Sequence, residues 1–248
     1  MRFASVTLDG CSSIFGKVEA SLKQAKTLEQ AAGHFVETLY TTFAESLVLV
    51  RMFVSIPFLE LPAFNRQRVS ARADDLGLAS KLSDNTPVLS LLATRGIAPA
   101  WNDRKQSQGH VGIPCLSREH VETIPMISRM ISELGYGFNW LKETGGEFDP
   151  EATSGLGKIF HVPHAQRSTD EKNRLIIPAQ DFVQTYGVKT VFGIGGRYMI
   201  RGNRMVVTIF FTKEEFGREI AQSFSPLISH FKSATVQHVI HEKTFSAE

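Results

Sequence analysis

The strongest constraint on the fold lies near the C-terminal end, where two apolar segments are separated by turn-forming residues. Segments 188–196 and 205–211 are rich in Val, Ile and Phe, which favour β-strands. Arg201, Gly202 and Asn203 stand between them, and both Gly and Asn tolerate the positive φ that a tight hairpin needs. The pattern therefore predicts two neighbouring antiparallel strands.

A helix is expected directly after this hairpin. Thr212 and Glu215 have the spacing of a capping box, and an apolar stripe at three- and four-residue steps follows, comprising Phe216, Ile220, Phe224, Leu227, Ile228 and Phe231. Pro226 interrupts the stripe and should kink or end the helix, because proline removes one backbone hydrogen bond. From Ser233 onward the chain is polar, and we expect this tail to fray or to pair with another segment.

The rest of the chain predicts further helices and strands. Helices with an apolar stripe are expected within 17–43 and within 124–134, and a surface helix is expected over 62–76. In the first of these ranges, Thr27 and Gln30 have the spacing of a capping box. Strands are expected over 46–56, 87–94, 110–116, 158–162 and 175–177, and one helical turn over 178–186. Few full-length helices separate these strands. The expected fold class is therefore α+β, with a largely antiparallel sheet, flanking N- and C-terminal helices, and helices to one side.

Composition predicts one globular domain over 1–248, with a core of about 28–232 and a polar tail over 233–248. A chain of 248 residues with 42% hydrophobic residues can bury a substantial core. No apolar run approaches the ~20 residues that span a bilayer. The start of the chain lacks the apolar stretch of a signal peptide. We expect a cytoplasmic protein without membrane contact.

Charge gives no indication of a nucleic-acid partner. The net charge of +2 provides no global field that would attract a polyanion. Arg66, Arg68 and Arg72 form a local basic cluster, but Asp74 and Asp75 dilute it, and a solvated helix face is the simpler interpretation.

The order of these segments resembles that of GAF domains, the sensory and regulatory domains of bacterial signalling proteins. The resemblance rests on VKTVFGIGG at 188–196, on VVTIFFT at 206–212 with the helix after it, and on the opening helix and strand 46–56. It covers roughly residues 28–232. Two insertions, at 62–86 and 140–157, depart from the compact family pattern; the second is glycine-rich and acidic and could form an excursion or a mobile lid.

The resemblance implies both an architecture and a role. It implies an antiparallel sheet of about six strands, with helices on one face and a small-molecule pocket on the other. It also implies amphipathic end helices that pair in a homodimer, and a signalling partner protein. The expected function is that of a small-molecule-binding sensory or regulatory domain in signal transduction. The sequence does not identify the ligand or any cofactor.

One loop carries candidate ligand-binding residues. Trp101 and Arg104 lie in the polar segment 97–109, where an aromatic ring and a guanidinium could hold a planar or anionic ligand. An ordinary solvated loop with one packed tryptophan is the alternative.

The remaining candidates are His110, Cys115, His161 and His164. Imidazoles at strand ends could ligate haem iron or a metal, which gives an alternative function as a cofactor sensor. Cys115 could serve a cysteine-dependent redox enzyme of GAF type if a base or a positive field activated it. We find no catalytic constellation and assign no metal site, so catalysis is not expected.

Overall fold

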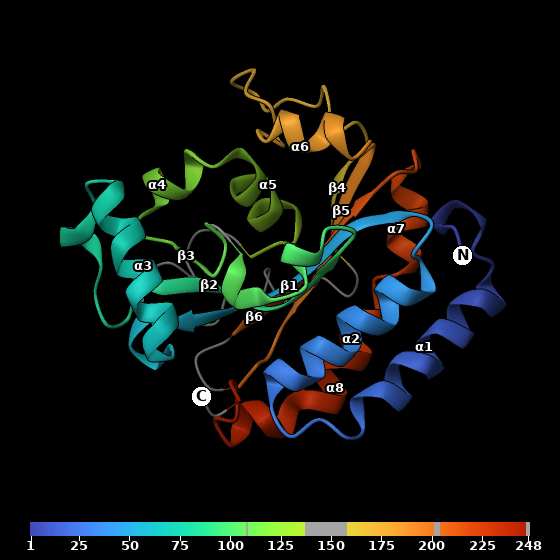
Figure 1. Cartoon of the computed structure of the whole chain (residues 1–248), viewed down its shortest axis with the longest axis horizontal. Helices are drawn as coiled ribbons and strands as arrows, with labels where there is room; N and C mark the ends of the chain where they lie inside the picture. The colour runs from blue at the N-terminus through green and yellow to red at the C-terminus, as the bar shows by residue number, and fades with distance from the viewer. Residues whose placement is uncertain (108, 137–157, 201–203, 247–248) are drawn as a thin grey trace.

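The computed structural model describes residues 1–107, 109–136, 158–200 and 204–246, which form one six-stranded sheet with helices on both faces (Figure 1). The strand order is β3-β2-β1-β6-β5-β4, and all five neighbouring pairs are antiparallel. The strands are β1 (Leu47–Pro57), β2 (Pro87–Gly96), β3 (Gly112–Pro114), β4 (Ile159–Val162), β5 (Thr190–Arg197) and β6 (Met205–Thr212). The expected α+β class with a largely antiparallel sheet and flanking N- and C-terminal helices is confirmed.

The helices form two unequal layers. One face of the sheet is covered by α1 (Leu8–Leu22), α2 (Leu28–Thr42), α7 (Arg218–Ser223) and α8 (Pro226–Ile240). The other face carries the shorter α4 (Arg118–Glu122), α5 (Pro125–Glu133) and α6 (Gln180–Thr185), while α3 (Ala63–Asp75) packs beside β3 at the sheet edge. Helices therefore lie on both faces, whereas the sequence predicted them on one side. None of the helices in the described ranges is long and apolar enough to span a bilayer.

Alternation along β1 separates the two cores. Val50, Met52 and Val54 point into the core beneath α1, α2 and α8. Leu49 and Phe53 belong to the core on the opposite face, because successive strand residues point to opposite sides. Both faces of this strand are buried, which explains its nearly continuous apolar sequence.

Phenylalanine rings fill the core beneath the long helices. Phe3 stacks on Phe43 with ring centroids 4.0 Å apart, and Phe192 stacks on Phe210 at 4.5 Å. Rings of this kind fill volume without needing hydrogen-bond partners.

The C-terminal helix begins later than the sequence predicted. Thr212 is the last residue of β6, and its hydroxyl lies 3.1 Å from the carbonyl oxygen of Thr190 and 3.0 Å from that of Glu214. The predicted capping box is therefore wrong, because Thr212 is held in the strand ladder. Pro226 ends one helix and opens the next: it occupies the first turn of α8, where its missing N–H is not needed.

The polar tail is ordered by the first turn of α2. The helix α8 continues past Ser233 to Ile240, so fraying from Ser233 is wrong. The backbone N–H of Leu28 donates to the carbonyl oxygen of Lys243 at 2.8 Å, and that of Glu29 donates to Thr244 at 2.9 Å. These N–H groups at a helix start have no partner within the helix, so the tail satisfies them.

Several boundaries also differ from expectation. The first helix, α1, begins at Leu8 rather than near residue 17, and α4 was not predicted. Thr27 caps α2 as predicted, accepting from the N–H of Gln30 at 3.1 Å, but the Gln30 side chain accepts from Lys26 rather than from Thr27. Segment 175–177 makes only an isolated bridge.

Two further predictions, the 140–157 excursion and the 201–203 turn, lie outside the described residues, the second of them between β5 and β6.

Candidate functional site

A cavity of about 590 Å³ lies between the sheet and the layer of short helices. Its floor comes from three adjacent strands, β2, β1 and β6, which contribute Leu89, Leu49, Arg51, Phe53, Val207, Ile209 and Phe211. Its opposite wall comes from α5 and α6, with Met126, Ile127, Met130 and Phe182. The rim is formed by residues 177–179 and by a rim loop after β2, which contributes Ala100, Trp101, Gln106, Ser107 and His110. A volume of this size is typical of small-molecule sites.

The α5 wall is fastened to the edge strand β4 through the backbone of His161. The Glu133 carboxylate accepts from the N–H of His161 at 2.8 Å, and the Arg129 guanidinium donates to its carbonyl oxygen at 3.0 Å. Arg129 and Glu133 also pair with each other one helical turn apart, at 3.1 Å. These polar contacts hold α5 over the cavity while its apolar stripe faces the core.

Trp101 is fixed at the rim by close packing. Its indole makes an edge contact with Tyr186 at a centroid distance of 4.7 Å and with Phe182 at 5.5 Å. Its other neighbour is Gly96, where an added Cβ would lie 2.7 Å from the Trp101 ring. The side chain of Asn102 accepts from the N–H of Gly96 at 2.9 Å, which ties this loop to the end of β2.

Arg51 is the outstanding polar residue of the cavity floor. It stands between Leu49 and Phe53 on the cavity face of β1, and its Nε atom is buried without a hydrogen-bond partner. Burial lowers the pKa of Arg51 to about 10, so the guanidinium still carries its charge at neutral pH. Among the described residues that line the cavity there is no Asp or Glu to balance it.

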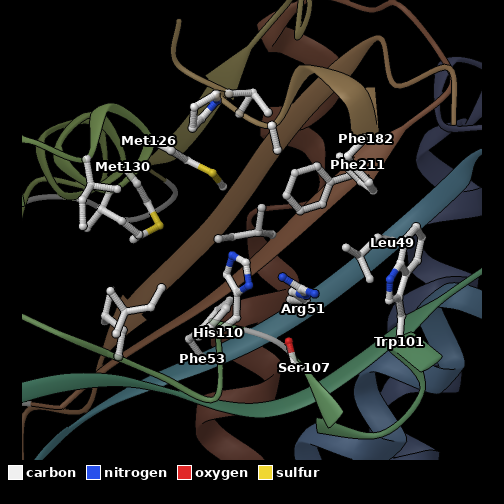
Figure 2. A pocket seen from close by; sticks show the side chains of 18 of the residues that line it. Leu49, Arg51, Phe53, Trp101, Ser107, His110, Met126, Met130, Phe182 and Phe211 are labelled. Atoms are coloured by element: carbon white, nitrogen blue, oxygen red, sulfur yellow. The ribbon is translucent and has the colours of Figure 1, made fainter. Parts of the chain in front are cut away.

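Ser107 brings a second unpaired polar group to the same cavity. The residue is 7% exposed, and its Oγ atom is buried without a hydrogen-bond partner. Figure 2 shows Arg51, Ser107 and His110 gathered in one part of the lining, with Met126 and Met130 across the cavity from them. The site thus has a small polar end and a large apolar remainder.

Two of the sequence candidates, Trp101 and His110, line this cavity. Arg104, from the same loop, turns away from it. Its guanidinium forms an ion pair with Glu29 of α2 and donates to the side-chain oxygen of Asn65 at 3.3 Å. With only 9% of its side chain exposed, Arg104 fastens the loop to the protein.

Cys115, His161 and His164 lie outside the cavity lining. Burial raises the pKa of Cys115 to about 12, which is the opposite of what a reactive thiolate requires. The His161 ring lies against Phe216, in the core of the opposite face, with Nε2 3.2 Å from the Phe216 carbonyl oxygen. Burial is the main cause of its lowered pKa.

The histidines do not converge on a metal centre. His164 is partly exposed and its Nδ1 lies 3.3 Å from the carboxylate of Glu215. Within the ranges that the structure describes, no group of three or more His, Cys, Asp or Glu side chains is placed to hold a metal ion.

Sequence reasoning missed Arg51 and Ser107. The signal for Arg51 was present, since it is the one charged residue in the apolar run LVLVRMFVSI. A charge within a strand that is buried on both faces needs a partner or a cavity. No local pattern distinguishes Ser107 from the other polar residues of its loop.

No protein-family model matches the chain, and no curated protein matches it. Among solved structures, it is similar to the phycoerythrobilin-bound GAF domain of a cyanobacterial phytochrome, with 9% identity, a TM-score of 0.46, and 94% of this chain and 97% of that chain covered. It is also similar to an N-acylhomoserine lactone dependent LuxR family transcription factor from Burkholderia cenocepacia, at 9% identity and a TM-score of 0.45, covering 96% and 99%. These likenesses identify no ligand.

Proposed function

We propose that this protein is a small-molecule-binding sensory domain whose ligand occupies the cavity between the sheet and α5–α6. The observation that carries the proposal is the cavity itself. It holds about 590 Å³, equal to roughly 20 water molecules at ~30 Å³ each, and its lining is mostly aliphatic, aromatic and Met side chains with a few polar groups at one end. Such a lining favours an organic ligand over a hydrated ion.

The walls of the cavity come from parts of the chain that are distant in sequence. Floor strands β1 and β6 also form the base of the core beneath α2 and α8, so a ligand on one face touches strands that support the helices on the other. A ligand can signal through such a connection only if it binds two conformations with different affinity. We propose that the long helices respond to the ligand and form the homodimer contact.

The site can be tested with a substitution that fills it. Val207 lies on the floor and is fully buried, so Val207→Phe places a ring in the cavity. Leu59→Phe is the matched control, because Leu59 is 56% exposed and lies outside the cavity lining. Thermal-shift screening with metabolites should find ligands that stabilise the protein and the control but not Val207→Phe. A ligand that stabilises all three equally would contradict the proposed site.

The homodimer is tested separately by sedimentation velocity with and without a ligand from that screen. The proposal expects a dimer whose dissociation constant changes on ligand binding. A monomer at all concentrations, in both conditions, would exclude signalling through paired helices and would leave the cavity assignment intact.

A further inference from the structure

The polar end of the cavity defines what kind of ligand it is built for. Arg51 places a positive charge on the floor, flanked by Leu49 and Phe53. In the described part of the chain no carboxylate forms an ion pair with it, and its Nε atom has no hydrogen-bond partner. A charge that is partly buried and has no partner in the protein costs free energy, and a bound anion would remove that cost.

Ser107 supports the same conclusion independently. Its buried hydroxyl, from the rim loop, also lacks a partner and faces the same space as Arg51. A guanidinium and a hydroxyl both donate hydrogen bonds, and a carboxylate oxygen accepts from both. A single acceptor group, such as a carboxylate, could therefore accept hydrogen bonds from both unpaired donors.

The apolar character of the rest of the lining favours a ligand with a single negative charge. Arg51 is the only Lys or Arg among the described residues that line the cavity. Beyond the polar end that it forms with Ser107 and His110, apolar side chains such as Met126, Met130 and Phe182 surround the space. A second anionic group would have to lie against these apolar side chains, at a large desolvation cost. Methionine side chains adapt to chains or rings of different shape.

Building on the proposed function, we propose that the ligand is an amphipathic monoanion: an organic acid whose single carboxylate binds Arg51 and Ser107 and whose apolar body fills the space beneath α5 and α6. Arg51 provides the fork geometry that fits a carboxylate with two parallel hydrogen bonds. Trp101 lines the same cavity, so its indole is placed to report on binding.

The test uses acids and their primary amides, which have the same size and differ in charge. The probes are 4-(1-pyrenyl)butanoate with 4-(1-pyrenyl)butanamide, and decanoate with decanamide. Titrations use the Trp140→Phe background, in which Trp101 is the only tryptophan of the chain. Binding is measured by calorimetry and by the change in Trp101 fluorescence. We expect each acid to bind about 10- to 100-fold more tightly than its amide, the range for hydrogen bonds to charged groups.

Variants assign this preference to the cavity residues. Arg51→Met should reduce the acid-to-amide ratio to roughly one, and Arg51→Lys should keep part of it, because lysine retains the charge without the fork. Ser107→Ala should lower the affinity for the acid by about threefold to tenfold, which is the effect of losing one hydrogen bond. Arg95→Met is the matched control: Arg95 lies on the neighbouring strand β2, pairs with Glu37 at 2.8 Å, and is outside the cavity lining.

The outcomes separate this inference from the function on which it rests. Equal affinities of acid and amide for the unsubstituted protein, or a preference that survives in Arg51→Met, would overturn the anionic ligand and leave the cavity as a site for neutral molecules. Failure of all four probes to bind the folded protein would count against the cavity as a binding site and so against the proposed function. If the preference for the acid is lost in Arg51→Met and kept in Arg95→Met, the result supports both the anionic ligand and the proposed function.

Discussion

The Arg104 guanidinium pairs with the Glu29 carboxylate, which joins the rim loop of the cavity to the first turn of α2. Glu29 also accepts from the backbone N–H of Ser246 at 2.7 Å, so a single carboxylate holds both the loop and the C-terminal tail. The Arg104 side chain in turn lies 5.4 Å from the Phe245 ring centroid. Three segments distant in sequence are thereby fixed at one point.

Breaking this pair should therefore destabilise the whole domain. Glu29 and Arg104 are 18% and 9% exposed, so Arg104→Met leaves a largely buried carboxylate without its main counter-charge. We expect the free energy of unfolding to fall by about 3 kcal/mol, the scale for removing one partner of a buried pair. Urea denaturation measures it, with the more exposed Arg95→Met as the control. Equal losses in the two variants would show that the Arg104 contact has no special role.

Arg51 should have the opposite effect on stability. In the absence of ligand its charge is partly buried and unpaired, so Arg51→Met removes a cost while keeping an unbranched apolar side chain of similar length. We expect the ligand-free protein to gain about 1–3 kcal/mol in unfolding free energy. Chemical denaturation of protein stripped of bound small molecules gives the value. A loss of stability would mean that Arg51 is compensated in the folded state.

Acid should weaken the fold through histidines that are wholly or partly buried. Burial is the main reason that the pKa values of His120, His161 and His238 lie below the ordinary value. Between the lowered folded pKa and the unfolded pKa near 6.5, the unfolded chain binds more protons. The stability contributed by these groups is thus full above about pH 6.5 and is lost as pH falls through their folded pKa values.

His161→Gln tests one of these contributions, because glutamine can still donate to the Phe216 carbonyl but does not titrate. Unfolding free energies at about pH 7.5 and about pH 5.5 should differ less in this variant than in the unsubstituted protein. His164→Gln is the control, since His164 is partly exposed. Identical pH dependence in all three proteins would contradict the assignment of the acid effect to His161.

Cys115 should be unreactive in the folded protein. Its pKa is raised from an ordinary value near 9 to about 12, so at a given pH its thiolate fraction is lower on the order of 10³-fold. Iodoacetamide labelling of a Cys11→Ala variant, followed by mass spectrometry, should be slower by at least this factor in native protein than in urea. Native labelling within about tenfold of the unfolded rate would mean that the thiol is accessible and ionised, as a redox function requires.

The sheet could be predicted from sequence because its strands carry local signals. The apolar segments around β1, β2, β5 and β6 are bounded by Pro, Gly or turn residues, and each is present close to its expected position. The start of the C-terminal helix was predicted too early. A threonine followed by a glutamate three residues later has the same local pattern whether it starts a helix or ends a strand. Only the pairing of Thr212 with β5 decides between them.

The cavity could not be predicted in the same way, because charge compensation depends on contacts distant in sequence. Arg104 stands in a polar loop and seemed suited to bind an anion, yet Glu29, 75 residues away, already neutralises it. Arg51 stands in an apolar strand, where the local sequence predicts only burial, yet no described carboxylate pairs with it. Which of two arginines has a partner is a property of the folded chain.

The central claim is that the cavity between the sheet and α5–α6 is a ligand site with its polar end at Arg51. The most direct measurement is a crystal structure of the protein with 11-bromoundecanoate, in which the anomalous signal of bromine locates the far end of the ligand. We predict the bromine peak inside the cavity near Met126 and Met130, with the carboxylate against Arg51 and Ser107. A bromine bound elsewhere on the protein, with the cavity empty, would contradict the account.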